Sequence, residues 1–231
     1  MGSTRLPGKV LQKVLDKSLL EYQLERLARA GEADELVVAT TVNPIDQPIV
    51  DLCDQHGVAW FRGDEEDVLD RYYRAALERG ADAVVRVTSD CPLIDPAVVD
   101  GVVRAYRDNS EKVDYVANTL QRTYPRGMDC EIFSSKVLAE AEQHASGSER
   151  EHVTMYIYRR PERYRLLNVS HSTDESQYRW TVDTPEDFEL IRRMIEALYP
   201  ESPRFTLEDC LSLIKAHPGW SQLNQHIRQK A

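Results

Sequence analysis

Cysteine is scarce in this sequence and is not arranged for metal binding or redox chemistry. The cysteines Cys53, Cys91, Cys130 and Cys210 lie far apart, and no two of them form a C-x-x-C pair. This spacing disfavours both a zinc site and a thiol–disulfide motif. The six histidines are scattered too, without metal-ligand spacing. We therefore expect reduced thiols that act as small core residues.

The sequence also lacks an excess of positive charge and any long apolar run. Its formal net charge of −10 argues against nucleic acid or an anionic membrane as a partner, because both require a dominant basic surface. No apolar stretch approaches the length of a transmembrane helix, and the first residues do not resemble a secretory signal. These absences favour a cytoplasmic protein that binds neither nucleic acid nor membrane.

Short apolar strands alternate with amphipathic helices along the sequence. This alternation is typical of a layered α/β fold with a mostly parallel sheet, and 231 residues suffice for a single domain spanning 1–231. Strands are predicted at 36–40, 58–61, 83–88, 113–117, 130–133, 164–169 and 178–182. Helices are predicted from Ser18 toward Gly31, before Gly57, and at 68–80, 134–145, 184–198 and 206–217.

Two of these helices have recognisable start signals. Ser18-Leu-Leu-Glu21 has the pattern of a capping box. Thr184-Pro185-Glu186-Asp187 places an N-cap residue, a proline at the first helical position and acids in the first turn.

The first nine residues, MGSTRLPGK, have the composition of a loop that cradles phosphates. Gly2 lets backbone N–H groups approach an anion, Ser3 and Thr4 add hydroxyls, and Arg5 and Lys9 add positive charge. The loop is not a Walker A motif, because the glycine spacing is wrong and Val10 stands where a metal-binding Ser or Thr is needed. From composition alone, a basic surface loop is the alternative.

Two acids follow predicted strands. Asp90 ends the run AVVRVTSD and Asp183 ends RWTVD. The carboxyl ends of parallel strands line one crevice, so the two carboxylates can converge there on a hard cation, for which magnesium is the natural choice. The alternative is that Asp183 assists Thr184 in capping a helix and Asp90 starts the turn into Pro92.

Five ordered segments together resemble the cytidylyltransferase superfamily, which includes the synthetases of CMP-linked acidic sugars, and in particular its spore-coat polysaccharide biosynthesis protein F branch. They are 1–11 (MGSTRLPGKVL), 62–73 (RGDEEDVLDRYY), 85–95 (VRVTSDCPLID), 149–152 (EREH) and 179–187 (RWTVDTPED). The resemblance covers nearly the whole chain. It implies a three-layer nucleotide-binding fold and a reaction in which a sugar or sugar-acid oxygen attacks the α-phosphate of CTP and pyrophosphate leaves, in surface or spore-coat polysaccharide biosynthesis.

The resemblance also implies roles for individual residues. Arg5 and Lys9 would hold the triphosphate as the catalytic cations, and Asp90 and Asp183 would carry Mg²⁺, which agrees with a reaction that depends on positioning and charge neutralisation. Arg71 would reach a nucleotide phosphate, although a helix arginine is often a solvated ion-pair partner.

Acceptor contacts are implied for an irregular segment and for one histidine. The segment contains Tyr124, Arg126, Asp129 and Glu131, for which a surface turn is the alternative. His152 would contact the sugar or act as an acid or base, and a packed helix histidine is the alternative. A homodimer is expected from the family.

One departure from the family concerns the first strand. In the family the phosphate loop follows a core strand, whereas this sequence begins inside the motif at Met1. We interpret this as a start codon assigned too far downstream, and expect the codons before it to encode a short apolar strand. A real loss of the strand is the alternative, and it predicts low stability and little activity because buried backbone groups would be unpaired.

Two other functions fit parts of the sequence. A metal-dependent glycosyltransferase would use a nucleotide sugar on a similar layered fold, but Asp90-Cys91-Pro92 lacks the second acid of an Asp-x-Asp motif. A truncated, non-catalytic nucleotide-binding protein is the other alternative, and the presence of both cations and both aspartates argues against it.

Overall fold

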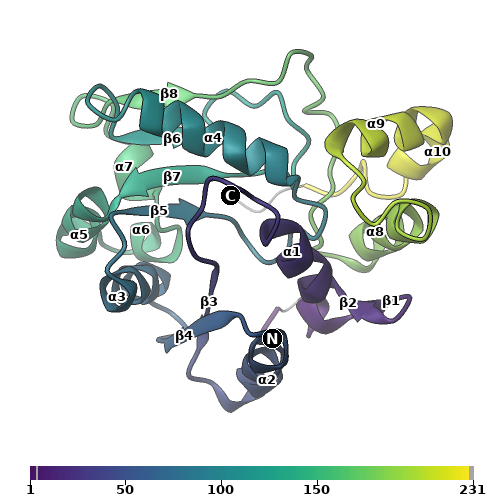
Figure 1. Cartoon of the computed structure of the whole chain (residues 1–231), viewed down its shortest axis with the longest axis horizontal. Coiled ribbons are helices and arrows are strands. Elements are labelled where there is room, and N and C mark those ends of the chain that lie inside the picture. The colour runs from purple at the N-terminus through teal and green to yellow at the C-terminus, as the bar shows by residue number, and fades with distance from the viewer. Residues whose placement is uncertain (4, 229–231) are drawn as a thin grey trace.

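The computed structural model describes residues 1–3 and 5–228 (Figure 1). The strands are β1 (Lys13–Val14), β2 (Lys17–Ser18), β3 (Val37–Thr41), β4 (Ala59–Gly63), β5 (Ala83–Arg86), β6 (Tyr115–Ala117), β7 (Glu131–Ser134) and β8 (Leu166–Asn168). The α-helices are α1 (Leu19–Leu27), α2 (Gln47–His56), α3 (Val68–Arg79), α4 (Pro96–Asp108), α5 (Ser135–His144), α6 (Ser148–Glu151), α7 (Met155–Tyr158), α8 (Pro185–Leu198), α9 (Leu207–Ala216) and α10 (Pro218–Ser221). Two short 3-10 helices are η1 (Lys9–Leu11) and η2 (Pro44–Asp46).

The strands form a mixed arrangement, with fewer parallel pairs than the sequence predicted. β3 and β4 pair in parallel, and β5-β7-β6-β8 form a second sheet in which β6 and β8 are parallel and the other neighbours antiparallel. β1 and β2 form a short antiparallel hairpin. Within the described ranges, no strand joins β3 to β5.

The larger sheet is covered by helices on both faces, which gives three layers. Successive strand residues point to opposite faces, and Ile132 on β7 joins a core with Val98 and Val102 of α4. Its neighbour Phe133 joins a second core with Leu69 and with residues of α5 and α7. Figure 1 shows α4 lying over β6, and α8, α9 and α10 gathered at one end of the molecule.

The local signals for helix starts are confirmed. At Ser18 the side chain accepts from the Glu21 N–H while the Glu21 carboxylate accepts from the Ser18 N–H, which completes the capping box of α1. At α8 the corresponding pair is Thr184 and Asp187. Gly57 ends α2 in the left-handed conformation, with a φ of 64°.

One expectation from the sequence is wrong, and one helix was missed. The segment 178–182 is not a strand: it forms one isolated bridge, between Arg126 and Arg179, because its N–H groups bond to two different loops rather than to one neighbouring strand. The helix α4 was not predicted, although Asp95 caps it and Pro96 stands at its first position.

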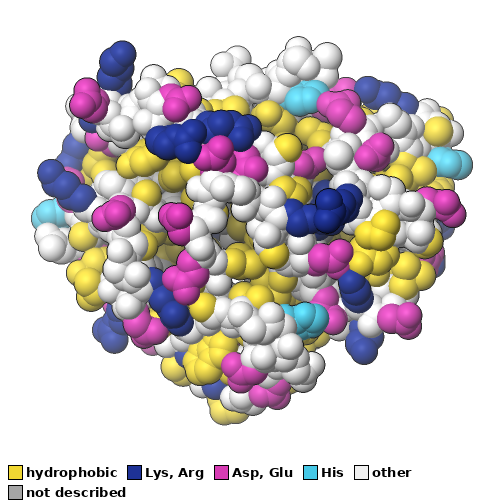
Figure 2. All heavy atoms as spheres, viewed as in Figure 1, with side chains coloured by type: hydrophobic (Ala, Val, Ile, Leu, Met, Phe, Trp, Pro, Cys, Tyr) yellow, Lys and Arg dark blue, Asp and Glu magenta, His cyan; other side chains and the backbone are white. Residues whose placement is uncertain are grey.

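The distribution of surface charge and the lengths of the helices were compared with what nucleic-acid or membrane partners require. Figure 2 shows Lys and Arg side chains interspersed with Asp and Glu on the face that it presents. No helix in residues 1–3 and 5–228 is both long and apolar enough to cross a membrane.

Candidate active site

The glycine-rich amino-terminal loop brings its two cations against two aspartates from later in the chain. Gly8 adopts a left-handed conformation with a φ of 66°, and Lys9 then begins η1. The Lys9 ammonium lies 2.8 Å from Asp183 Oδ1 and 3.7 Å from Asp90 Oδ2. The Arg5 guanidinium lies 3.1 Å from Asp183 Oδ2. We call these four side chains, which the sequence predicted to converge, the ion cluster.

Asp183 is the centre of the ion cluster and is nearly buried, with 9% of its side chain exposed. Arg179 donates to Asp183 Oδ2 at 2.7 Å and also pairs with Asp187. Burial alone would raise the pKa of the Asp183 carboxyl, but the cations of Lys9, Arg179 and Arg5 outweigh it, and the pKa lies below its usual value. Asp183 is therefore ionised at neutral pH.

Backbone hydrogen bonds hold Asp90 beside the segment that carries Asp183. The Asp90 carbonyl oxygen accepts from the Val182 N–H at 2.8 Å and from the Thr181 hydroxyl at 3.2 Å. The Thr88 hydroxyl donates to the Asp90 carboxylate. Asp90 thus belongs to a turn, as the alternative interpretation had it, and also faces Lys9.

The two aspartates fit a magnesium ion. Among residues 1–3 and 5–228, no group of three or more His, Cys, Asp or Glu side chains is placed to hold a metal. Magnesium is commonly held by one or two carboxylates and completes its shell with water and phosphate oxygens. Asp90 and Asp183 suit that pattern when a nucleotide provides the remaining oxygens.

The rest of the phosphate loop passes close to the turn before α3. A Cβ added at Gly2 would lie 3.1 Å from the Glu65 carboxylate. Ser3 accepts a hydrogen bond from the Leu6 N–H at 3.3 Å, which shapes the loop. Thr4, which the sequence also assigned to the nucleotide, lies outside the described residues.

Arg71 contacts the turn before α3 and does not join the ion cluster. Its guanidinium donates to the Asp64 carbonyl at 2.8 Å, and its side chain lies against Gly63. Burial lowers the pKa of the Arg71 guanidinium. Its predicted contact with a nucleotide phosphate stays a prediction.

Of the residues predicted to contact the acceptor, Asp129 lies in the same cavity as Asp90. Arg122 donates to both Asp129 carboxylate oxygens, at 2.5 and 2.7 Å. Glu131 is buried instead, pairs with Arg86 and accepts hydrogen bonds from the hydroxyls of Thr154 and Tyr115. In this arrangement Glu131 joins β7 to its neighbours, so its oxygens are already engaged.

Of the three remaining acceptor candidates, Arg126 lines both of the cavities described below, whereas Tyr124 and His152 line neither. Tyr124 packs against His171 with ring centroids 5.1 Å apart, and burial raises the pKa of its hydroxyl. His152 follows α6 and is half-buried. Contact of either side chain with an acceptor stays a prediction.

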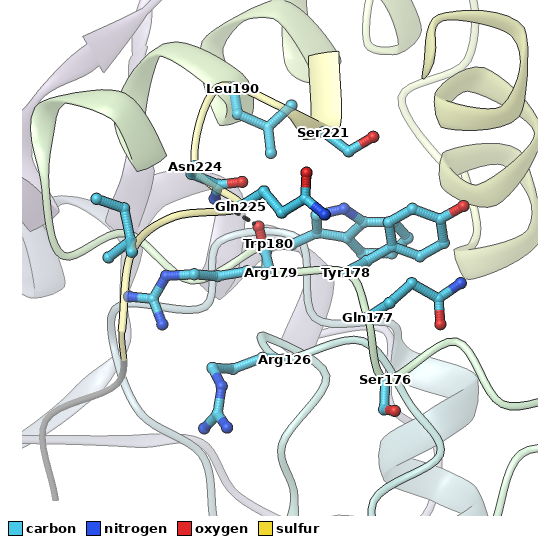
Figure 3. A pocket seen from close by; sticks show the side chains of 11 residues that line it. Arg126, Ser176, Gln177, Tyr178, Arg179, Trp180, Leu190, Ser221, Asn224 and Gln225 are labelled. Carbon is cyan, nitrogen blue, oxygen red and sulfur yellow. Dashed lines mark hydrogen bonds between the residues drawn. The ribbon is translucent and has the colours of Figure 1, made fainter. Parts of the chain in front are cut away.

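Two small cavities meet at Arg126. Cavity A has a volume of about 180 Å³ and is lined by Thr88, Asp90, Cys91, Arg126, Gly127, Asp129 and Thr181. Cavity B has a volume of about 190 Å³ and lies between the 176–180 segment and the carboxyl-terminal segment 221–227. Figure 3 shows Arg126 on the side of cavity B away from Leu190, Ser221 and Asn224.

Gly127 lets the loop that carries Arg126 pack closely against Trp180. Its φ is 107°, and an added Cβ would lie 2.7 Å from the Trp180 carbonyl carbon and oxygen. The Trp180 N–H donates to the Arg126 carbonyl at 2.6 Å and the Arg126 N–H donates to the Tyr178 carbonyl at 3.0 Å. The loop and the 178–180 segment are thus held together at the wall between the cavities.

We expect Gly127→Ala to destabilise the protein by about 2–4 kcal/mol, because the new methyl group both clashes and strains the backbone. Urea unfolding measures the change. The matched control is Gly101→Ala on α4, where nothing lies within 4 Å of the added Cβ. That change should stabilise the helix by about 0.5–1 kcal/mol. Equal stability of the two variants would show that the loop can move away from Trp180.

Sequence reasoning did not assign a role to Arg122 or Arg179, although both pair with carboxylates of the site. A signal existed for Arg179, which precedes Asp183 by four residues and Asp187 by eight. No comparable signal existed for Arg122, because its partner lies across an irregular loop.

Cations from a glycine-rich loop, set opposite paired carboxylates on a three-layer α/β fold, are typical of a nucleotidyltransferase site. The chain belongs to the cytidylyltransferase family, whose model matches residues 1–210.

Several relatives that cover most of the chain support this assignment. Spore coat polysaccharide biosynthesis protein SpsF of Bacillus subtilis is 31% identical over 226 residues, which cover 94% of this chain and 92% of that protein. The structure of a cytidylyltransferase from Leptospira borgpetersenii is 36% identical with a TM-score of 0.93, covering 99% of this chain and 95% of that one. The 3-deoxy-manno-octulosonate cytidylyltransferase of Pseudomonas syringae pv. tomato is 28% identical over 246 residues, covering 85% of this chain and 95% of that protein. The resemblance to the family and to its SpsF-like branch is confirmed.

Proposed function

We propose that this chain transfers CMP from CTP to a sugar or sugar acid, with release of pyrophosphate and with Mg²⁺ as cofactor. The observation that carries the proposal is the ion cluster, in which Lys9 bridges Asp183 and Asp90 and Arg5 pairs with Asp183. The names of two relatives, one acting on 3-deoxy-manno-octulosonate and one in spore-coat polysaccharide biosynthesis, support a sugar-acid acceptor and a surface-polysaccharide pathway.

The chemistry follows from the charges of the cluster. An acceptor hydroxyl oxygen forms a bond to the α-phosphorus of CTP and releases its proton to solvent, and the bond from that phosphorus to the bridging oxygen breaks as pyrophosphate leaves with the electron pair. Arg5 and Lys9 bind the phosphate tail and oppose the charge that grows on the leaving group. Asp90 and Asp183 would hold Mg²⁺, which neutralises phosphate charge. When Mg²⁺ and CTP bind, Lys9 would exchange its carboxylate partners for phosphate oxygens.

The reaction is tested by supplying each of the four nucleoside triphosphates with a panel of sugars and sugar acids and measuring pyrophosphate. We expect release with CTP that requires both an acceptor and Mg²⁺ and stops when EDTA is added. Pyrophosphate release with a different nucleoside triphosphate, and none with CTP, would contradict the choice of cytosine. CTP binding without pyrophosphate release for any acceptor would contradict the reaction itself.

A glycosyltransferase would instead hydrolyse a nucleotide sugar or transfer the sugar from it. Supplying the same acceptors with CMP- and UDP-sugars therefore distinguishes a glycosyltransferase from a cytidylyltransferase. The ion cluster favours the triphosphate, because its two aspartates are 93 residues apart and its two cations lie in one phosphate-binding loop. A cytoplasmic location, a homodimer and the exclusion of nucleic acid and membrane as partners stay predictions.

A further inference from the structure

A network of buried polar side chains connects Asp183 to the carboxyl-terminal segment. Its members are Arg179, Asp183, Asp187 and Asn224, all of them buried. The Arg179 guanidinium donates from Nε to Asp187 Oδ1 at 2.9 Å and from Nη2 to Asp187 Oδ2 at 3.1 Å. The same Nη2 donates to Asp183 Oδ2 at 2.7 Å. One guanidinium therefore binds both carboxylates.

Asn224 is the member of this network that comes from the carboxyl-terminal segment. Its amide nitrogen donates to the Arg179 carbonyl oxygen and to Asp187 Oδ1, each at 2.8 Å, and Figure 3 shows the first of these bonds. Asn224 thus ties the backbone of Arg179 to the carboxylate that orients the Arg179 guanidinium. It lies beyond residue 210, where the match to the family model ends, so that match gives it no role.

The Asp187 carboxylate is completely buried, so its oxygens depend on donors from the protein. Oδ2 accepts from Arg179 and from the backbone N–H groups of Asp183 and Thr184. Oδ1 accepts from Arg179 and from Asn224. Hydrogen bonds to a buried charge are costly to lose. Loss of Asn224 should therefore turn the Arg179 guanidinium further toward Asp187 and away from Asp183.

The orientation of the Asp183 carboxylate depends on Arg179. Arg179 binds Oδ2, whereas Oδ1 lies on the side of the Lys9 ammonium, which is 2.8 Å from it and 3.7 Å from Asp90 Oδ2. Asp183 Oδ1 is therefore the oxygen on the side of Asp90. Arg5 also pairs with Oδ2, but in the proposed reaction it binds the phosphate tail, which leaves Arg179 to hold the carboxylate. A carboxylate that Arg179 no longer held could rotate, and ordering it again would weaken metal binding.

We propose that Asn224 is a positioning residue for the metal site: by holding the pair of Arg179 and Asp187, it keeps Asp183 Oδ1 on the side of Asp90. The proposal rests on the proposed function, in which Asp90 and Asp183 hold Mg²⁺, and adds to it a residue from outside the matched region. Asn224 acts through its two partners and not by contact with metal or nucleotide.

The first test measures metal binding without turnover. Asn224→Leu keeps the size of the side chain and removes both donors, and Asn224→Ser keeps a single hydroxyl donor. The probe is Mn²⁺, which prefers the same oxygen ligands as Mg²⁺ and whose free concentration is measured by electron paramagnetic resonance. Partners of metal ligands change metal affinity by about 10- to 100-fold, and Asn224 is one contact further out, so we expect Asn224→Leu to raise the Mn²⁺ dissociation constant by about 3- to 10-fold. Asn224→Ser should raise it less.

The second test measures CMP transfer by the same variants at increasing Mg²⁺. We expect the Mg²⁺ concentration for half-maximal rate to rise by about 3- to 10-fold in Asn224→Leu. At saturating Mg²⁺, kcat should return to near the wild-type value, because excess metal compensates for a weaker site. A merely structural role would lower stability or kcat without changing the Mg²⁺ requirement.

Leu223→Ala is the matched control, because it separates positioning from a general loosening of the carboxyl-terminal segment. Leu223 precedes Asn224 and packs against the hydrophobic core. Its truncation should lower stability in urea while leaving the Mn²⁺ dissociation constant and the Mg²⁺ requirement unchanged. If Asn224 only fastened the segment to the core, Leu223→Ala and Asn224→Leu would change both metal constants alike.

Wild-type metal constants in the folded Asn224 variants would overturn the proposal, and so would an equal rise in Leu223→Ala. If neither Asn224 variant folds, the residue is a requirement of the fold and the positioning role is refuted. If the wild type binds too little Mn²⁺ to measure, the Mg²⁺ requirement of turnover decides.

The two tests also distinguish this proposal from the proposed function. Mn²⁺ binding that weakens in Asn224→Leu, in a protein that releases no pyrophosphate, would support the positioning role and refute the reaction. Turnover with unchanged metal constants would support the reaction and refute the positioning role. A wild type with neither Mn²⁺ binding nor Mg²⁺-dependent turnover would refute both.

Discussion

Replacing Lys9 with methionine is expected to lower kcat/KM for CMP transfer by about 100- to 1,000-fold, since it removes a cation placed to meet the triphosphate. Methionine keeps most of the length of the side chain but cannot oppose charge on the departing pyrophosphate. Steady-state pyrophosphate release measures the effect. Lys13→Met is the matched control, because Lys13 is exposed on β1, outside the ion cluster. If both variants retained wild-type kcat/KM, Lys9 would not act on the nucleotide.

The same variant should respond more strongly to magnesium. Without Lys9, the carboxylates of Asp90 and Asp183 lose the ammonium that lies 3.7 and 2.8 Å from them, and their repulsion is less screened. Added Mg²⁺ should therefore raise the thermal midpoint of Lys9→Met more than that of the wild type. Equal shifts in the two proteins would place the metal elsewhere.

Asp90→Asn and Asp183→Asn should both reduce CMP transfer by at least about 100-fold, but only the second should strongly destabilise the fold. Asp183 is 9% exposed and is shared by Lys9, Arg5 and Arg179, so its loss removes a nearly buried carboxylate from three cations and costs about 2–4 kcal/mol. Asp90 is 24% exposed, and replacing its carboxylate should cost less than about 1 kcal/mol. Urea unfolding and pyrophosphate release, measured on the same preparations, give both quantities.

The stability difference between wild type and Asp183→Asn should also depend on pH. The pKa of Asp183 is lower in the folded protein than in the unfolded chain, so the ionised carboxylate contributes stability fully above the unfolded value of about 3.9. That contribution is lost as the pH falls through the lower folded pKa. The gap between the two proteins should be constant near neutrality and should narrow below about pH 4. A gap of the same size at pH 3 and pH 7 would contradict this assignment.

The parts of the fold that depend on residues close together in the sequence could be predicted from it. The capping boxes of α1 and α8 each need two side chains three positions apart, so Ser18-Glu21 and Thr184-Asp187 identify them without any tertiary information. The convergence of Asp90 and Asp183 was predicted from expected strand ends, but Asp183 follows an irregular segment rather than a strand, so that prediction depends on the family resemblance.

The remaining features depend on contacts that no local pattern records. The 178–182 segment has the β-branched and aromatic residues of a strand, yet its hydrogen bonds go to Arg126 and Asp90 in two separate loops. The role proposed for Asn224 becomes visible only when the partners of Arg179 and Asp187 are known. By contrast, α4 was open to prediction, since Asp95-Pro96 precedes apolar residues at helical spacing.

The contact between Lys9 and Asp183 joins residues 174 positions apart. Closing so long a loop is slow compared with forming local helices, and on the ribosome it cannot happen until most of the polypeptide has emerged. A nascent chain thus displays the cationic loop long before its acidic counterpart exists. The complete ion cluster therefore forms late in synthesis. Its formation requires that the amino-terminal loop contact a segment that is made much later.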